Sequence, residues 1–412
     1  MHLPLDWPAM DSDRAEPRKP ARRLFPLLVG VYFAGGLLTS MVSLLVPRLK
    51  LLLGLDYAQA LSVHLAYYTS YLLFAVPIAV LTIRAGYLRA VTAGLAVMAI
   101  ACLMLATANG ERSFAGVLLA LLALSSGVTF LQIAGNAVTT AIVPPERFAE
   151  RLTLLQGFNS LGTVLGPLTG AWFLLGHYEG PVLPNIPFLV SALALALLAL
   201  GFAGARHALP RLATADAPAL ARLPVLLAAG RMRAGVAAIF VYVGAEVTIG
   251  TLAISYLMLP RSIGVSALAA GRLVSLYWAG AMIGRFAGAA MLRRIGAARL
   301  LLWAASAATL LVAGAIGLHG LSGAIAILAI GLCNSVMFPT IYALALPDGQ
   351  EDTPLAAMLL CMAVVGGAIV PMVAGMVADA AGLATSLIVP GFCYLAIGGF
   401  ALYRRPSEPE AA

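Results

Sequence analysis

One acidic residue stands alone near the middle of a long apolar segment of this sequence. Glu246 lies in the stretch 234–259, which Arg233 precedes and Arg261 follows at similar distances. In a segment that spans a bilayer, an acid at the centre costs about 3 kcal/mol on insertion scales, and such acids commonly lie on ion or substrate paths. Glu246 is therefore a candidate site for a coupling proton. The alternative is a glutamate that only packs against neighbouring helices.

Polar side chains in other apolar segments recur at helical spacing. Spacings of three and four residues put side chains on one face of a helix. The sets are Gln132 and Asn136; Gln156, Asn159 and Thr163; His64, Tyr67, Tyr68 and Tyr71; and Tyr242 with Glu246. Amides that face lipid would lack hydrogen-bond partners, so we expect these faces to point inward.

Two interpretations of these polar faces remain open. In the first, amides and hydroxyls hold helices together at about 1 kcal/mol each, as Asn159 and Thr163 beside small residues would. In the second, they line a cavity, where amides suit the adjacent hydroxyls of a sugar and an aromatic ring covers its C–H surface. The residues predicted to bind substrate are Gln132, Asn136, Gln156, Asn159, Tyr242, Trp278 and Asn334.

The arginines within the apolar segments favour a neutral substrate. An anion would call for a central positive charge, but Arg272 and Arg285 lie near opposite ends of their segment, where long side chains snorkel. Topology alone explains the basic residues in the short turns, and gating is a secondary hypothesis for four of them. These are Arg84, Arg89, Arg285 and Arg294.

The composition requires a membrane protein and excludes several classes of function. Hydrophobic residues make up 62% of the 412 and charged residues 10%, against about 25% charged in soluble proteins. The net charge of +8 is spread over short links between apolar segments, so we exclude nucleic-acid binding. The sequence has no nucleophile elbow, metal-ligand spacing or phosphate-binding loop, so we predict neither an enzyme nor a cofactor or metal. Any active transport would then use an ion gradient.

The apolar segments are long enough for twelve transmembrane helices. They lie near 24–46, 62–83, 89–107, 115–142, 154–176, 185–204, 234–259, 266–291, 299–318, 321–345, 354–378 and 384–403. Links on the N-terminal side hold 19 of the 25 Lys and Arg residues, which predicts that both termini are cytoplasmic. The predicted parts are a cytoplasmic segment 1–23, six helices in 24–204, a cytoplasmic linker 205–233, six helices in 234–403 and a cytoplasmic tail 404–412.

The two sets of six segments share short patterns. Gly162 and Pro167 in segment five match Gly366 and Pro371 in segment eleven at the same internal spacing. A duplicated six-helix unit is the plan of major facilitator transporters, which bind substrate near the midplane between the halves. We therefore predict an all-α membrane protein with this fold.

Several motifs resemble a known branch of these transporters. The stretches Leu131–Asn136 and Leu155–Thr163 resemble the fucose:proton symporter family of the major facilitator superfamily. Tyr242–Gly250, Tyr277–Arg285 and Asn334–Thr340 are similar to its glucose/galactose branch. The resemblance implies cation-coupled uptake of monosaccharides, with Gln132, Asn136, Gln156 and Asn159 in or beside the sugar cavity.

The sequence departs from the fucose-type pattern at two acidic positions. Ser43 stands where the family resemblance implies an acid in segment one, and Gln132 stands where it implies one in segment four. Glu246 is then the only membrane-buried carboxylate available for coupling. Either Glu246 binds the proton, or this chain does not use a carboxylate for coupling.

These observations predict a multi-pass transporter of the bacterial inner membrane that acts as a monomer in the lipid bilayer. It would import a neutral hexose, deoxyhexose or amino sugar by alternating access, with a proton favoured over sodium as the coupling cation. The alternatives are an efflux antiporter for sugars or drugs on the same fold and a transport-inactive sugar sensor. The identity of the sugar and facilitated diffusion stay open.

Overall fold

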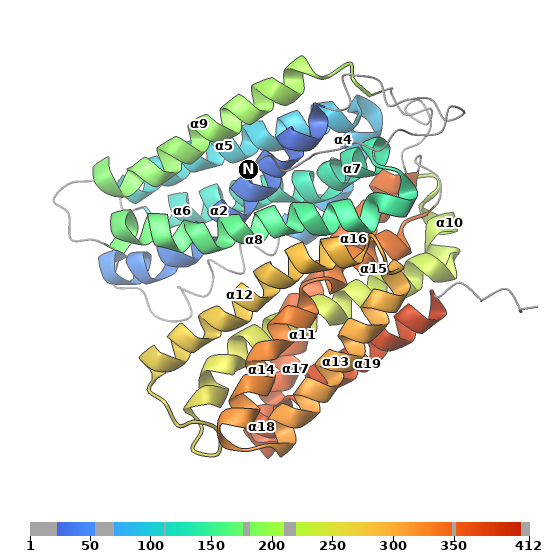
Figure 1. Cartoon of the computed structure of the whole chain (residues 1–412). Coiled ribbons are helices and arrows are strands. Elements are labelled where there is room, and N and C mark those ends of the chain that lie inside the picture. Colours follow the sequence, from blue (N-terminus) through green and yellow to red (C-terminus); the bar gives the residue numbers. More distant parts are fainter. Residues whose placement is uncertain are drawn as a thin grey trace, which may run out of the picture.

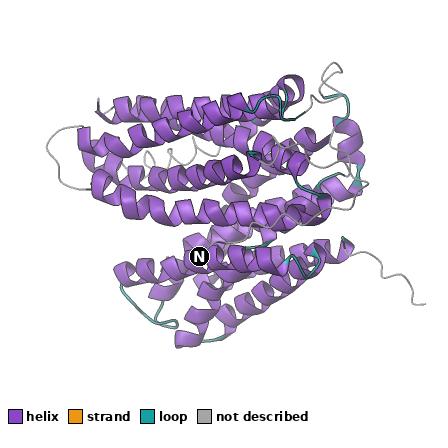
Figure 2. Ribbon diagram, turned by 45° about the horizontal axis from the view of Figure 1, so that its top comes forward, coloured by secondary structure: helices purple, strands orange, loops and turns teal. Residues whose placement is uncertain are grey.

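The computed structural model describes residues 23–53, 70–110, 113–175, 182–209, 220–347 and 352–404. Over these ranges the regular structure is helical and no strand occurs, as Figure 2 shows. Helices are the expected result for such apolar segments, because each helix satisfies its own backbone hydrogen bonds within lipid.

The helices form two groups that follow the order of the chain. Figure 1 shows the first group, blue to green, above the second, yellow to red. The first half comprises α2 (Leu24–Leu53), α4 (Ala75–Ala85), α5 (Tyr87–Gly110), α6 (Phe114–Phe130), the π-helical η1 (Leu131–Gly135), α7 (Asn136–Ile142), α8 (Pro145–Leu175) and α9 (Val182–Gly204). The second half comprises α11 (Gly230–Met258), α12 (Ala267–Met291), α13 (Ala297–Gly317), α14 (Gly320–Asn334), α15 (Met337–Ala345), α16 (Thr353–Met362), the short 3-10 helix η3 (Ala363–Val365), α17 (Gly366–Ala381), α18 (Leu383–Ser386) and α19 (Ile388–Tyr403).

Each of the twelve predicted segments overlaps a helix in the described residues. Nine helical stretches there are long and apolar enough to cross a membrane, and α4 is a shorter apolar helix. The nine do not include α8 or α12, which pack against each other and against helices of their own halves. The count of twelve spans stays a prediction.

Two helical regions differ from the sequence-based boundaries. Helix α8 begins at Pro145, well before the predicted start at 154. Proline at the first position and Glu146 in the first turn favour this start, so the helix continues beyond the apolar segment. The predicted linker 205–233 also holds a short helix, α10 (Leu223–Ala228), and the first residues of α11.

The two halves repeat one close helix contact. A Cβ atom on Gly162 of α8 would overlap the carbonyl oxygen of Phe33 in α2. A Cβ atom on Gly366, the first residue of α17, would overlap the carbonyl oxygen of Phe240 in α11 in the same way. Small residues let transmembrane backbones approach closely. The matched glycines of the sequence therefore serve equivalent contacts between the first and fifth segments of each half.

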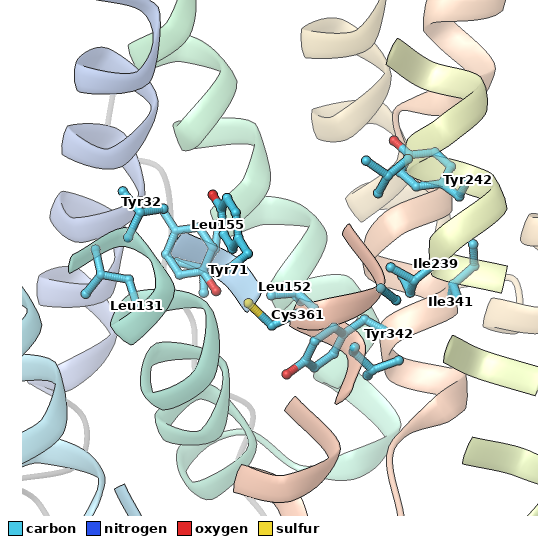
Figure 3. Packing of buried hydrophobic residues seen from close by; sticks show 14 of the residues in the cluster. Tyr32, Tyr71, Leu131, Leu152, Leu155, Ile239, Tyr242, Ile341, Tyr342 and Cys361 are labelled. Carbon is cyan, nitrogen blue, oxygen red and sulfur yellow. The ribbon is translucent and has the colours of Figure 1, made fainter. Parts of the chain in front are cut away.

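The halves meet at one end of the bundle. Helix α8 packs against α12 and α15, and α16 packs against α4, η1 and α7. Figure 3 shows Leu152 of α8 beside Cys361 and Tyr342 of the second half, in one buried cluster. We call this the arginine-rich end, because its turns and helix ends carry Arg84, Arg89, Arg147, Arg293 and Arg294.

Candidate functional site

A cavity of about 310 Å³ lies between the two halves. This volume is at the lower end of the range for small-molecule sites. Its polar lining from the first half consists of Tyr32, Thr39, Tyr71, Gln132, Asn159, Ser160 and Thr163. The second half contributes Glu246, Trp278 and Arg285 among apolar residues. Of the predicted polar face that includes Tyr71, the other three residues, His64, Tyr67 and Tyr68, lie outside the described residues.

The first half gives the cavity a neutral, polar wall. Gln132 lies in η1, and π-helical turns of this kind often occur at functional sites. The Asn136 side-chain amide donates a 3.4 Å hydrogen bond to the Gln132 side-chain oxygen. The Asn159 amide donates to the carbonyl oxygen of Tyr32 in α2 at 3.0 Å. Asn159 therefore both connects helices and faces the cavity, so both interpretations of its role are retained.

The second half contributes an ion pair to the cavity. The Arg285 Nη2 atom lies 3.8 Å from Glu246 Oε1, and the two side chains are only 14% and 18% exposed. Arg285 Nη1 also donates a hydrogen bond to the Ser160 hydroxyl of α8, across the boundary between the halves. The Arg285 Nε atom is buried and makes no hydrogen bond. One guanidinium thus contacts both halves and the carboxylate at the same time.

The side chain of Arg285 reaches further than we predicted from its position. Arg285 lies near the inner end of its segment, as we predicted, but its side chain lines the central cavity. The physical reason is the direction of helical side chains, which tilt toward the helix N-terminus. Because α12 runs toward the arginine-rich end, the long Arg285 side chain extends back toward the middle of the bundle.

Hydrogen bonds fix the helix that carries Glu246. The Tyr242 hydroxyl donates to the Asn334 carbonyl at 3.1 Å, and the Asn334 amide donates to the Tyr277 hydroxyl at 2.8 Å. The Tyr277 hydroxyl in turn donates to the Glu246 carbonyl at 3.3 Å. Trp278 lies against Tyr277 in an edge-on arrangement, with ring centroids 5.0 Å apart. This buried network positions Glu246 and Trp278 in the cavity wall.

The predicted substrate residues divide into two groups. Gln132, Asn159 and Trp278 line the cavity. The others are buried and are not among its lining residues, so the structure does not place them in contact with a cavity ligand; they are Asn136, Gln156, Tyr242 and Asn334. Helical spacing identified the inward faces correctly, but it does not give the depth at which neighbouring helices close over a side chain.

A second charged cluster, which the sequence analysis did not identify, lies at the arginine-rich end. Glu150 of α8 is only 3% exposed and accepts hydrogen bonds from Arg147 at 3.0 and 3.2 Å. It also accepts one at 3.1 Å from Arg293 of the second half, and Arg151 lies 3.8 Å away. The missed signal is the Pro145 helix start followed by charges at helical spacing.

The electrostatics of this cluster favour an ionised carboxylate. Burial raises the pKa of Glu150, but the hydrogen bond from Arg147 and the charges of Arg147, Arg151 and Arg293 outweigh burial. The net effect holds the pKa of Glu150 below its ordinary value. By contrast, the residues predicted as secondary gating candidates in the loops, Arg84, Arg89 and Arg294, are exposed.

Comparison with known proteins agrees with this architecture. The family model described as the Major Facilitator Superfamily matches residues 28–348. The chain belongs to the major facilitator superfamily. The predicted all-α fold of this superfamily is thereby confirmed, and the chain is a multi-pass membrane protein.

Several curated transporters are similar to this member of the superfamily over most of their length. A glucose/galactose transporter of Brucella abortus biovar 1 (strain 9-941) is 37% identical over 380 residues, which cover 90% of this chain and 92% of the relative. The L-fucose-proton symporter of Escherichia coli (strain K12) is 27% identical, with 96% of each chain covered. The predicted resemblance to the fucose:proton symporter family and its glucose/galactose branch is confirmed.

A solved structure gives the same fold. The transporter FucP in the outward conformation superimposes with a TM-score of 0.85 at 24% sequence identity, over 94% of this chain and all of that one. A bacterial homologue of the iron transporter ferroportin in an outward-facing state superimposes with a TM-score of 0.74 at 12% identity. These likenesses concern the fold alone.

Proposed function

We propose that this chain is a secondary transporter that imports a neutral monosaccharide together with a proton by alternating access. The observation that carries the proposal is the cavity between the halves, with neutral amides and hydroxyls on one wall and a single paired carboxylate on the other. The named activities of the relatives, glucose/galactose transport and L-fucose–proton symport, support the same substrate class.

The proposed sugar contacts follow from the chemistry of the lining. Gln132 and Asn159 offer donors and acceptors on one flat group, which matches two adjacent hydroxyls. Trp278 offers an apolar ring for the C–H surface of the sugar. Glu246 and Arg285 neutralise each other, so the cavity presents no net charge to the ligand. A neutral hexose or deoxyhexose therefore fits better than a sugar acid.

Glu246 is the proposed proton site. Among the described residues that line the cavity it is the only carboxylate. Ser43 and Gln132 replace the acids that the fucose-type resemblance implies. One proton changes its charge from negative to neutral and removes the ion pair with Arg285. The cavity thereby contains a group whose interactions depend on protonation.

The proposed orientation places the arginine-rich end in the cytoplasm of a bacterial cell, with the chain in the inner membrane as a monomer. The concentration of arginines at that end supports this topology. The contacts between the halves lie at the same end and the cavity lies beyond them, which supports an outward-facing state. The twelve spans and the two six-helix parts belong to the same proposal.

Uptake of radiolabelled sugars by proteoliposomes, under separate proton and sodium gradients, tests this function. We expect accumulation of one or a few neutral monosaccharides under an inward proton gradient, and no accumulation under a sodium gradient alone. Right-side-out and everted vesicles report the direction of transport. Accumulation that follows sodium alone would overturn the proton coupling, and net export or no flux of any sugar would overturn the proposed import.

A further inference from the structure

The contact between α8 and α12 runs as one antiparallel line from the cavity to the arginine-rich end. From the cavity outward, the facing pairs are Ser160 with Arg285, Gly157 with Phe286, Thr153 with Gly288, and Glu150 with Arg293. The line extends over residues 160 to 150 of α8, which is about 15 Å of helix. We call these four pairs the α8–α12 interface. It has to open if the cavity is to reach the arginine-rich end.

Arg285 is the member of this interface that also contacts Glu246. Its planar fork lets one nitrogen donate to Ser160 of the first half while another lies 3.8 Å from the carboxylate of the second half. The remaining nitrogen, Nε, is buried without a hydrogen bond. The guanidinium is therefore held at the interface by Ser160 and by the charge of Glu246.

The charge of Glu246 decides whether this position is favourable for Arg285. A largely buried guanidinium is tolerated when a carboxylate neutralises it, and removal of one partner leaves an uncompensated charge. Protonation of Glu246 is such a removal, since only the neutral acid remains. The guanidinium then gains by moving toward water or substrate hydroxyls, and that movement breaks its bond to Ser160.

We propose that Arg285 is a positioning residue that couples the charge of Glu246 to the α8–α12 interface, so that protonation of Glu246 favours separation of α8 from α12. The inference rests on the proposed function, in which Glu246 binds the coupling proton. It adds a residue whose role is to connect proton binding with the change of conformation.

The other titratable groups near Glu246 do not compete for this role. Tyr242 lies on the same helix, Tyr277 on α12 and Tyr394 on α19. On the first-half side, Tyr32 and Tyr71 line the same cavity. Phenols titrate near pH 10 and guanidinium groups above pH 12, so neither changes charge between about pH 5 and pH 8.

Spin-label distances across the interface test the proposal without requiring transport. Labels on Pro145→Cys and Gly296→Cys, both exposed positions at the arginine-rich end, are placed in the full-length, otherwise cysteine-free protein in lipid nanodiscs. We expect the population with the longer distance to rise by about fivefold or more as the pH falls from about 8 to about 5. In Arg285→Gln the distribution should be the same at both pH values.

Three further variants make the outcome specific to Arg285. Arg272→Gln removes an exposed arginine of the same helix and should keep the pH response. Arg285→Lys keeps the positive charge but lacks the planar guanidinium, and it should keep part of the pH response. This variant tests the proposal even if Arg285→Gln does not fold. Ser160→Ala removes only the partner across the interface and should reduce the response. A wild-type response in Arg285→Gln, or no response in a folded Arg285→Lys, overturns the proposal.

The failure of this inference is distinguishable from failure of the proposed function. If wild-type proteoliposomes do not accumulate sugar under a proton gradient, the proposed function fails, whatever the distances show. If accumulation depends on the proton gradient and on Glu246 while Arg285→Gln keeps the wild-type pH response, the inference alone fails.

Discussion

The two ends of the α8–α12 interface use the same chemistry in different surroundings. At the cavity end, Glu246 faces one arginine, Arg285, and both groups reach the cavity where a substrate would bind. At the arginine-rich end, Glu150 is surrounded by three arginines and is almost completely buried. The charge of Glu246 is balanced by one arginine. Glu150 is held by three arginines, which is an excess of positive charge.

Because of this difference, one interface can be both stable and responsive to protonation. An acid among three arginines stays ionised over the physiological pH range, so the contact between Glu150 and Arg293 is constant. An acid with one arginine loses its only ion-pair partner when it binds a proton. We therefore expect the arginine-rich end to set the stability of the closed interface and the cavity end to set its response to protons.

The largest effect is expected from Glu246→Gln. The amide keeps the shape of the side chain and removes its charge, so Arg285 loses its counterion at every pH. Sugar accumulation under a proton gradient should fall by about tenfold or more. Uptake by proteoliposomes measures this, with Asp379→Asn, an exposed acid of α17, as the matched control. Undiminished sugar accumulation in Glu246→Gln would contradict the assignment of the proton response to the cavity end of the α8–α12 interface.

The next effect is expected from Glu150→Gln at the other end. The change leaves three arginines without their acid, and loss of one partner of a buried pair costs about 3 kcal/mol. The closed interface should weaken at all pH values, so the longer spin-label distance should gain population while its pH response remains. If the variant instead loses the pH response, the assignment of stability to one end and proton response to the other is wrong.

The pH dependence of thermal stability should show that Glu150 stays ionised. A carboxyl whose pKa is lowered on folding stabilises the protein above its unfolded pKa, and this stabilisation is lost as the pH falls through the folded value. For Glu150 that window lies below the ordinary value of 4.5. The difference in thermal stability between wild type and Glu150→Gln should be constant from about pH 8 to pH 5 and shrink only in stronger acid. A difference that already shrinks near pH 6 would contradict an acid held by three arginines.

A smaller effect is expected from Trp278→Ala, which tests the ligand side of the cavity end. Loss of the ring should weaken the free energy of sugar binding by about 1 kcal/mol, which corresponds to roughly a fivefold rise in KM. The pH response of the α8–α12 interface should be retained. Trp303→Ala on α13 is the matched control, because Trp303 is exposed and does not line the cavity. An equal rise in KM in both variants would argue against a ring contact with the sugar.

The smallest effect is expected from Arg293→Gln. The Arg293 side chain is 61% exposed. When Arg293 is replaced, Arg147 and Arg151 still neutralise Glu150. The closed interface should weaken by about 1 kcal/mol or less, which is typical of solvent-exposed ion pairs. Spin-label distances measure this shift beside that of Glu150→Gln. If the population with the longer distance rises more in Arg293→Gln than in Glu150→Gln, Arg293 and not the buried Glu150 stabilises the arginine-rich end.

Hydrophobicity and repetition were enough to predict the all-α fold of the superfamily. Apolar length located a helix for each predicted segment, and the matched Gly162 and Gly366 mark equivalent close contacts in the two halves. The isolated charge of Glu246 also indicated a site between the halves. These features depend on local properties, namely the length of a segment, the size of a side chain and the cost of a charge in lipid.

The composition of the cavity wall depended on properties that the sequence does not carry locally. The reach of Arg285 follows from the direction of its helix, and the burial of Asn136 and Asn334 follows from helices far away in the chain. The cluster around Glu150 forms because α8 continues beyond the apolar segment and meets Arg293 of the other half. Hydropathy assigns that charged turn to a loop.

Sugar-dependent proton movement shows whether Glu246 carries the coupling proton. Proteoliposomes that contain wild-type protein or Glu246→Gln are placed in a weakly buffered medium, and the external pH is recorded when a transported monosaccharide is added. We expect the sugar to make the medium more alkaline with wild type, because protons enter with it, and to cause no change with Glu246→Gln. Sugar uptake without alkalinisation in wild type, or equal alkalinisation with both proteins, would contradict the claim that Glu246 carries the coupling proton.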